Sequence, residues 1–355
     1  MIDWLTFVAP LDHVSDESGP FWAGEVMATR PDPTHADGFC LDWSVLKRMT
    51  FEGSHSSTIQ IQSTRDEFGR PALWVSGNPA KWFQGHNIFG VDDLHGLVLE
   101  MIERVCSSVG ITPTAQNRLE WKEGLIRLSR VDVTYSFDLG SLARARNALA
   151  ALDRSANMKF RGRGFFRGDS LIFGKGSRRS SVTLYLKGAE IEVKGHELPL
   201  LLKETHLPVV AAGLLRAEVR LLGLELKDRG LEYAHRWGDN SASELHRVFM
   251  EHLQISEAFM LDPEVIDGLP GRLQLTYQSW REGHDLRTML AHRTFYRYRT
   301  ELLKHGIDIG VKQERREDAP SNVVPLPVVL HARPFETPDW AIGTPLYFEP
   351  RARFG

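Results

Sequence analysis

The chain has 355 residues, of which 42% are hydrophobic and 25% charged, and its formal net charge is -3. This length is enough for two compact domains, and no apolar run approaches the ~20 residues that span a bilayer. The composition excludes a small disulfide-stapled scaffold, and the two cysteines do not suit a zinc site. We expect a cytoplasmic protein without membrane partners, because the first residues lack the features of a secretory signal.

Alternating apolar and polar residues dominate the first part of the chain. The segment 58–77 reads as two strands around a charged turn that contains glycine, which predicts a hairpin. Helical spacing then covers 91–109, where Asp92 and Asp93 are candidate caps, and a second helix is expected over 141–152.

Three further strands are predicted at 125–137, 180–188 and 214–223, because these segments alternate or are rich in β-branched and aromatic residues. Strands with interspersed helices predict an α+β domain built on an antiparallel sheet, over residues 1–228.

The composition changes after that point. Amphipathic patterns at 241–261 and 285–306, with a shorter helical stretch at 273–283, predict a small helical domain over residues 229–310. Residues 311–355 are charged and then rich in proline, so we expect an extended arm rather than a third domain.

A local excess of positive charge contrasts with the net charge of the chain. Between Lys159 and Lys187 there are eight basic residues and one acidic residue, a balance of 8 − 1 = +7. Such a segment can dock a polyanion. Its candidate phosphate contacts lie in a basic turn that contains glycine and are Lys175, Arg178 and Arg179.

Two of the predicted strands place charged side chains on one face. Period-2 alternation groups Asp132 with Arg130 on one strand, and Glu218 with Arg216 and Arg220 on the other. If the strands are neighbours, the carboxylates suit a hard cation such as Mg²⁺ or Mn²⁺, and the arginines suit a phosphodiester. From spacing alone, arginine–carboxylate ladders on a solvated face explain the pattern at least as well.

The third strand adds a candidate nucleophile. Tyr185 shares a strand face with Lys187, directly after the basic segment. A tyrosine attacks poorly at its ordinary pKa of ~10, so it needs nearby positive charge or a metal-polarised phosphate. A lone tyrosine in a strand more often serves packing.

A longer motif connects these residues to a known family. The run from Asn78 to Gly90 resembles the NPAK-x-x-QGHN-x-FG signature of the gene II/X replication initiators of filamentous phages. The same pattern continues, in order, with MID at residues 1–3, S-R-x-D-x-T-x-S at 129–136, Y-L-K-x-x-E at 185–190, R-x-E-x-R at 216–220, F-x-R-Y at 295–298, NVVPL at 322–326 and PDW at 338–340.

This resemblance implies a site-specific nickase for rolling-circle replication. Tyr185 would attack one strand of an origin and later help to rejoin it, with Lys187 supporting the reaction. Asp132 and Glu218 would hold Mg²⁺ or Mn²⁺, with Glu190 as a third ligand or supporting group. The implied partners are supercoiled origin DNA, a host helicase and a host polymerase in the bacterial cytoplasm, and the protein could form an oligomer at the origin.

A more distant likeness to single-tyrosine plasmid initiators implies a degenerate member of the His-hydrophobe-His endonuclease fold. This sequence has no His-x-His pair, so carboxylates would have to replace the usual metal ligands. Within the signature, His86 is a candidate ligand, but a hydrogen-bonding strut is the favoured interpretation. The residues of interest in this motif loop are Asn78, Lys81, Gln84, His86 and Asn87.

The C-terminal helices suggest a second contact with DNA. The stretch from Leu273 to Gly306 can form a helix-turn-helix-like unit, in which Phe295, Tyr298, Leu302 and Leu303 face the core and Arg293 and Arg297 face a duplex. A solvated basic helix is the ordinary alternative. Two other functions stay open: an origin-binding repressor that does not cleave, and a metal-dependent nuclease that uses water.

Overall fold

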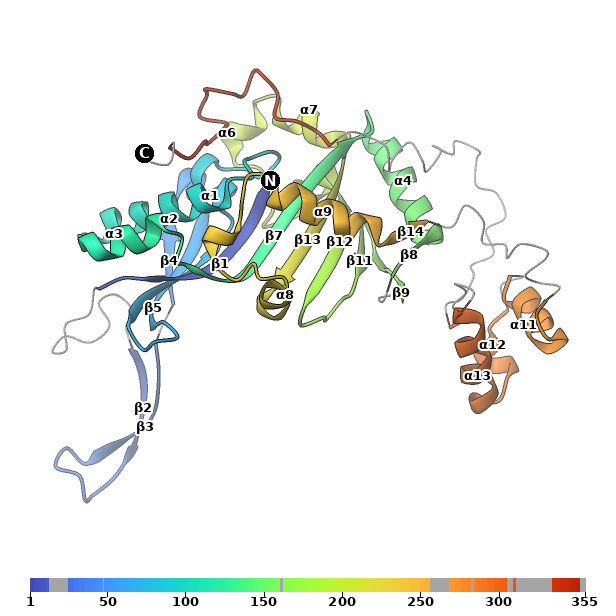
Figure 1. The fold of residues 1–355 in the computed structure, drawn as a ribbon, viewed down its shortest axis with the longest axis horizontal. Coiled ribbons are helices and arrows are strands. Elements are labelled where there is room, and N and C mark those ends of the chain that lie inside the picture. Colours follow the sequence, from blue (N-terminus) through green and yellow to red (C-terminus); the bar gives the residue numbers. More distant parts are fainter. Residues whose placement is uncertain are drawn as a thin grey trace.

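One antiparallel sheet of nine strands organises the protein in the computed structural model (Figure 1). The structure describes residues 1–12, 25–46, 48–159, 162–255, 268–281, 284–304, 309–310 and 334–351. In spatial order the strands are β10 (Phe165–Arg167), β11 (Ser170–Phe173), β12 (Ser180–Leu186), β13 (Leu214–Leu222), β7 (Arg127–Asp138), β1 (Ile2–Pro10), β6 (Pro71–Gly77), β5 (Thr58–Arg65) and β4 (Met49–Glu52). The predicted antiparallel α+β architecture is confirmed.

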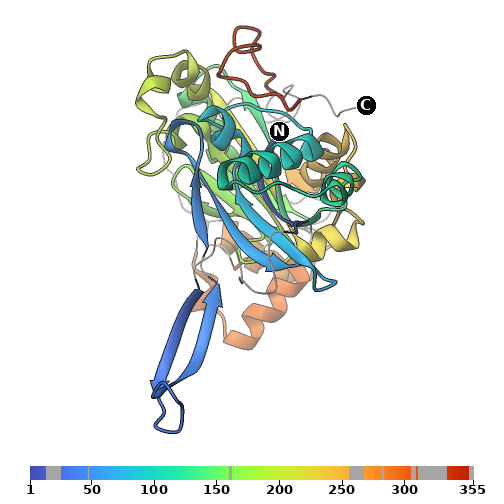
Figure 2. The same cartoon turned by 90° about the vertical axis from the view of Figure 1, so that its left-hand side faces the viewer.

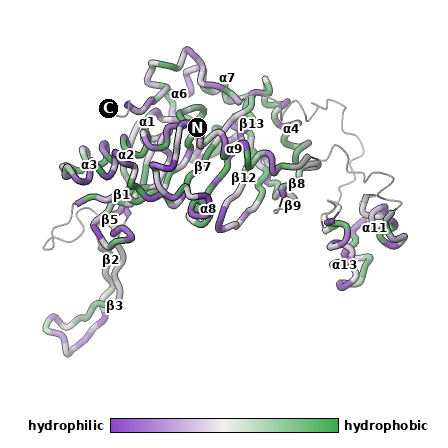
Figure 3. Tube along the Cα trace, in the orientation of Figure 1, coloured by the Kyte–Doolittle hydropathy of each residue, from purple (hydrophilic) through white to green (hydrophobic). Residues whose placement is uncertain are grey.

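The strands that carry the candidate site lie side by side. β12 pairs with β13, and β13 pairs with β7, so that Thr183, Glu218 and Thr134 stand in one row. Hydrophobic and hydrophilic residues alternate along these strands (Figure 3). The sheet therefore has an apolar face and a polar face, and the polar face carries the charged residues that the sequence singled out.

Helices cover the apolar face. α2 (Leu94–Val109), α9 (Ser241–Glu251) and α4 (Leu142–Ser155) cross the same side of the sheet in Figure 1. Both sequence-predicted helices are confirmed, and the cap of α2 is Asp93, whose carboxylate accepts from the Gly96 amide at 2.9 Å. The six α2 residues at helical spacing are all buried, as are Leu5, Phe7, Val131 and Val133 of the sheet.

Shorter elements complete this part of the fold. The helices are α1 (Pro79–Gln84), α3 (Ala115–Lys122), α5 (Lys187–Glu190), α6 (Leu200–Lys203), α7 (Leu207–Ala212) and α8 (Gly223–Asp228), with the 3-10 turns η1 (Ser54–Ser56) and η2 (Ala234–Arg236). A small sheet contains β14 (Leu253–Ile255), β8 (Ala156–Met158) and β9 (Gly162–Arg163). The hairpin of β2 (Glu25–Pro31) and β3 (Phe39–Leu46) projects away from the large sheet in Figure 1 and Figure 2.

Packing around the sheet continues past residue 228, where the sequence placed a domain boundary. Leu245 and Phe249 of α9 and Leu253 of β14 belong to the same hydrophobic cluster as the sheet. An amphipathic pattern predicts that a helix has an apolar face, but it does not say which core that face covers. The segment from α9 to Ile255 therefore packs with the N-terminal unit.

The C-terminal helices form a hydrophobic cluster of their own. α11 (Gly271–Arg281), α12 (Leu286–Met289) and α13 (His292–Leu303) confirm the predicted helical stretches, and Phe295 and Leu302 of α13 are buried among Leu273, Tyr277 and Trp280. Leu303 was predicted to face this core and does not, since 45% of it is exposed. Eight residues at ~100° each turn it about 80° away from Phe295, whereas Leu302 returns to within about 20°.

The C-terminal segment 334–351 returns to the large sheet without regular secondary structure. The Phe335 amide donates to the Ser136 carbonyl of β7 at 2.6 Å, and the Phe348 ring stacks on Phe83 of α1 with centroids 4.0 Å apart. The NVVPL motif at 322–326 lies outside the described residues. Among the described helices, none has the length and apolar content to cross a membrane.

The two neighbouring leucines of α13 give a matched test of its packing. We expect Leu302→Ala to destabilise the cluster by about 2–5 kcal/mol, because it leaves a cavity. Leu303→Ala should change stability by about 0.5 kcal/mol or less, because its side chain already meets solvent. Amide hydrogen exchange of α13 in the full chain measures both, and equal loss of protection in the two variants would contradict the observed orientation.

Candidate active site

Tyr185 lies on the polar face of β12, directly opposite Arg216 of β13. Its side chain is partly buried. Burial raises the pKa of Tyr185 well above its ordinary value of 10, and Glu218, Asp3 and Glu190 raise it further, whereas Arg216 lowers it. The phenol is therefore protonated in the resting protein, and Arg216 is the cation that favours its ionised form.

Arg216 is fully buried beneath this face. Its Nε donates to Ser136 Oγ at 3.0 Å and its Nη2 to the Ile88 carbonyl at 2.6 Å, whereas Nη1 is buried without a hydrogen-bond partner. The enclosure corrects the prediction that Arg216 contacts DNA phosphates from the surface of the sheet. The guanidinium instead provides fixed positive charge next to Tyr185.

Lys187 is also completely buried, at the point where β12 ends and α5 begins. Its Nζ donates to Asn87 Oδ1 at 2.8 Å and pairs with the Glu190 carboxylate. Burial, reinforced by Arg216, lowers the pKa of Lys187 to about 7. Glu190 also lies 3.2 Å from Nδ1 of His196, so its carboxylate is bonded to Lys187 rather than gathered with Asp132 and Glu218.

Asp3 joins the site, although the reasoning from strand patterns did not select it. The β1–β7 register shifts between Ile2 and Trp4, and this bulge brings Asp3 to the polar face. Asp3 Oδ1 accepts from Nδ2 of Asn87 at 2.7 Å and from Nδ2 of Asn78 at 3.0 Å. Alternation cannot reveal a bulge, so the only available signal was the MID motif of the resemblance.

The motif loop holds this network from outside the sheet. Asn87 bridges Asp3 and Lys187, and Asn78 also caps α1 by accepting from the Lys81 amide at 2.8 Å. Gln84 donates to the Phe89 carbonyl at 2.8 Å and accepts from the Phe348 amide at 2.8 Å. The motif is therefore a scaffold made of short hydrogen bonds.

His86 has the hydrogen bonds of a strut. Its Nδ1 accepts from the Ile88 amide at 3.2 Å, which assigns the proton to Nε2, 2.9 Å from the Leu346 carbonyl. Burial is the largest influence and lowers the pKa of His86 to about 4, so the ring is neutral at pH 7. With both nitrogens engaged, this geometry favours the strut over a metal ligand.

Asp132 and Glu218 form arginine–carboxylate ladders. Arg130 donates to both oxygens of Asp132, at 2.9 and 2.5 Å, and Arg220 bridges Asp132 at 3.1 Å to Glu218 at 3.0 Å. Burial and the neighbouring carboxylates of Asp132 and Asp3 raise the pKa of Glu218 to about 8. An accumulation of negative charge thus remains around Glu218 despite the arginines.

These oxygens fit a hard cation by their charge and chemistry. No group of three or more His, Cys, Asp and Glu side chains in the described ranges is arranged to hold a metal ion. Mg²⁺ often uses only one or two protein carboxylates, together with water and substrate phosphate. Asp132 and Glu218 match that mode, and Arg220, which bonds both, would have to yield to the cation.

The remaining predicted DNA contacts differ in availability. Lys175 and Arg178 are exposed in the turn before β12, and Lys175 lies over the Phe165 ring at 3.6 Å. Arg179 is paired with Glu225 and Asp228 of α8. Arg293 and Arg297 are exposed on α13. Arg161, part of the basic segment, lies outside the described residues.

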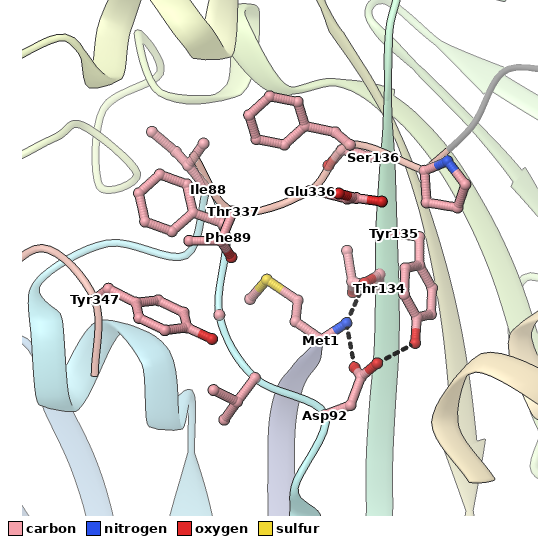
Figure 4. A pocket seen from close by; sticks show the side chains of 14 residues that line it. Met1, Ile88, Phe89, Asp92, Thr134, Tyr135, Ser136, Glu336, Thr337 and Tyr347 are labelled. Atoms are coloured by element: carbon pink, nitrogen blue, oxygen red, sulfur yellow. Dashed lines mark hydrogen bonds and ion pairs between the residues drawn. The ribbon is translucent and has the colours of Figure 1, made fainter. Parts of the chain in front are cut away.

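A hollow of about 330 Å³ borders the buried network where the C-terminal segment crosses β7 (Figure 4). The Met1 amino group donates to the Thr134 carbonyl at 2.8 Å and pairs with Asp92 at 2.6 Å, and Asp92 also accepts from the Tyr135 hydroxyl. Ser136, which accepts from Arg216, lines the same hollow. Tyr185 does not line it, so the hollow is separate from the tyrosine's open side.

Comparison with known proteins identifies the class. Residues 1–240 match the N-terminal family of the phage replication-associated protein encoded by gene II, and residues 261–349 match the C-terminal family of the same protein. The chain is 35% identical over 342 residues to the replication-associated protein of this type from Enterobacteria phage I2-2, and the match covers 95% of each chain. The chain belongs to this family of phage replication-associated proteins, which confirms the resemblance found in the sequence.

A solved structure of the Rolling Circle Replication Initiator Protein from Geobacillus stearothermophilus is a weaker match. It has a TM-score of 0.34 and 11% identity, and the match covers 74% of this chain and 88% of that chain. A likeness of this size does not define the fold, which rests on the sheet topology described above.

The raised pKa of Glu218 makes a prediction about stability. A carboxyl whose folded pKa exceeds its ordinary 4.5 supplies stability that is complete at low pH and is lost as pH rises through about 8. Glu218→Gln mimics the protonated form and can still accept from Arg220. Without divalent metal, we expect its melting temperature to rise relative to wild type between pH 5 and pH 8.5.

Glu225→Gln provides the control, because Glu225 pairs with Arg179 and Arg229 outside this cluster. Its difference from wild type should not grow over the same range in the same direction. A pH-independent difference for Glu218→Gln would show that this carboxyl ionises normally in the folded protein.

Proposed function

We propose that this protein initiates rolling-circle replication by nicking one strand of an origin with Tyr185 and later rejoining it. The observation that carries the proposal is the position of Tyr185, opposite the buried Arg216 on the polar sheet face, in a chain of the replication-associated family. A packing tyrosine would not need a buried guanidinium with an unpartnered nitrogen beside it.

The proposed step conserves the energy of the phosphodiester. Tyr185 Oη attacks the scissile phosphorus and loses its proton to solvent, while the bond from phosphorus to the 3′ oxygen breaks. The 3′ oxygen takes up a proton and becomes a free 3′-OH for a host polymerase, and the 5′ phosphate stays on the tyrosine. Attack by a 3′-OH on the same phosphorus reverses the step and closes the strand.

The chain's own groups have separate parts in this step. Arg216 stabilises the tyrosinate as the proton leaves, because a buried cation acts across a low dielectric. Lys187 and Asn87 keep the end of β12 and Asp3 in place. Mg²⁺ held by Asp132 and Glu218 would neutralise charge on the phosphoryl oxygens. Glu190 serves better as the partner of Lys187 than as a third ligand.

Duplex recognition is assigned to the C-terminal helices. Arg293 and Arg297 are exposed on α13, whose opposite side packs on α11 and α12. A base contact from such an arginine discriminates by about 1–3 kcal/mol, which a small active site alone does not supply. The exposed Lys175 and Arg178 are suited to sequence-independent phosphate contacts near the tyrosine.

Replacing the tyrosine tests the nucleophile. Tyr185→Phe removes one oxygen and keeps the ring, so nicking of supercoiled origin DNA and the protein-linked 5′ end should both disappear while DNA binding stays close to wild type. Tyr233→Phe is the matched control, since that hydroxyl donates to Glu67 away from the site. Denaturing gels detect both products. Nicking by Tyr185→Phe without an adduct would favour water as nucleophile, and DNA binding by a wild type that never nicks would favour a repressor.

A magnesium titration tests the carboxylates. We expect Mg²⁺ to raise the melting temperature of wild type and to support nicking, and expect Glu218→Gln and Asp132→Asn to lose both responses, because each removes an oxygen charge from the site. Glu190→Gln should keep the Mg²⁺-dependent shift. Unchanged thermal shifts in all three variants would place the metal elsewhere.

A further inference from the structure

The polar face of the sheet extends beyond the carboxylates onto β1 and β6. Trp4 stands opposite Asp132, Thr6 stands opposite both Arg130 and Ser76, and the next pair is Val8 with Trp74. Residues that face each other across neighbouring strands point to the same side of a sheet. Two tryptophans therefore lie on the face that carries Tyr185, and both are partly exposed.

Each tryptophan carries an arginine on its ring. The Arg130 guanidinium lies 4.7 Å from the Trp4 ring centroid, and the Arg48 guanidinium lies 4.5 Å from the Trp74 ring centroid. Arg130 is also the bidentate partner of Asp132, so the first of these pairs touches the carboxylate ladder directly. Cationic and aromatic groups thus alternate outward from the candidate metal ligands.

Hydrogen bonds fix the inner ring and leave small side chains between the two. Trp4 Nε1 donates to Ser76 Oγ at 3.2 Å, and the hydroxyls of Thr6 and Ser76 are 2.8 Å apart. By register, Trp4 and Trp74 are four residues apart along adjacent strands, so their Cα atoms are separated by about 14 Å. A shallow strip with a ring at each end has room for the bases of a few successive nucleotides.

We propose that this strip, made of Trp4, Arg130, Trp74 and Arg48 and here called the stacking strip, binds the single strand next to the scissile phosphate. The inference rests on the proposed nicking function and identifies where the flanking strand lies. Bases stack on indole rings and guanidinium planes whatever their identity, and arginine adds attraction for the phosphates. The strand would leave the tyrosine, pass the carboxylates and cross β1 and β6.

The chemistry favours a single strand over a duplex. In a duplex the faces of the bases are already stacked, and only their edges and the backbone are available in the grooves. Flat rings that are paired with arginines and embedded in a sheet face match exposed base faces instead. Duplex binding is left to the exposed arginines of α13.

The test compares oligonucleotides with the full-length protein. One labelled single strand ends close to the nick site on both sides, and two longer ones extend to one side or the other. We expect Trp74→Ala to weaken binding of one extended strand by roughly 5- to 150-fold, the effect of losing one stacked base. Binding and nicking of the short strand should stay at the wild-type level, and Arg48→Ala should show a smaller loss on the same extended strand.

Two variants separate stacking from a folding defect. Trp74→Phe keeps a ring and should restore most of the affinity. Phe68→Ala removes an exposed ring that also carries an arginine, Arg70 at 5.5 Å, but lies in the turn beyond the strand ends, so it should bind all three strands like wild type. Melting temperatures show whether each variant is folded.

The outcomes distinguish this inference from the nicking function. If wild type nicks the short strand and Trp74→Ala binds both extended strands as well as wild type does, the stacking strip is overturned. Equal weakening on the short and extended strands would also overturn it. If wild type never nicks but Trp74→Ala still loses affinity for one extended strand alone, the strip stands and the nicking function fails.

Discussion

The burial of charge beside Tyr185 is the constraint on which the rest of the site depends. Lys187 and Arg216 are both fully buried, and each would cost several kcal/mol if left without partners. Asn87 meets part of that demand by accepting from Lys187 with its oxygen and donating to Asp3 with its nitrogen. One amide thus ties β1, the start of α5 and the motif loop together, and the tyrosine keeps its position relative to the carboxylates because these elements cannot shift separately.

Electrostatic balance explains why the carboxylate ladders are compatible with a metal. Arg130 and Arg220 keep Asp132 and Glu218 oriented in the absence of a cation, yet the raised pKa of Glu218 indicates that two arginines do not offset all of the nearby negative charge. A site prepared in this way can exchange one positive partner for another. The arrangement holds its shape between turnovers without fixing a metal permanently.

Much of the fold followed from the sequence, because the signals were local. Alternation predicted the strands of Asp132, Tyr185 and Glu218, and helical spacing predicted α2 and α13. The same signals could not reveal the bulge that turns Asp3 inward, the burial of Arg216, or the place of α9 on the first core, since these depend on contacts between distant segments. Leu303 shows the limit within one helix, where a single position decides between core and solvent.

The end of the chain supports a motif that is synthesised near its beginning. His86 bonds to Leu346, 260 positions later, and Gln84 accepts from Phe348, 264 positions later. A polypeptide leaves the ribosome from its N-terminus, so most of the sheet is available before these supports exist. The loop that steadies Lys187 and Asp3 reaches its final form only when residues 346–348 have emerged, and the finished arrangement is therefore a property of the whole translated chain rather than of its first 255 residues.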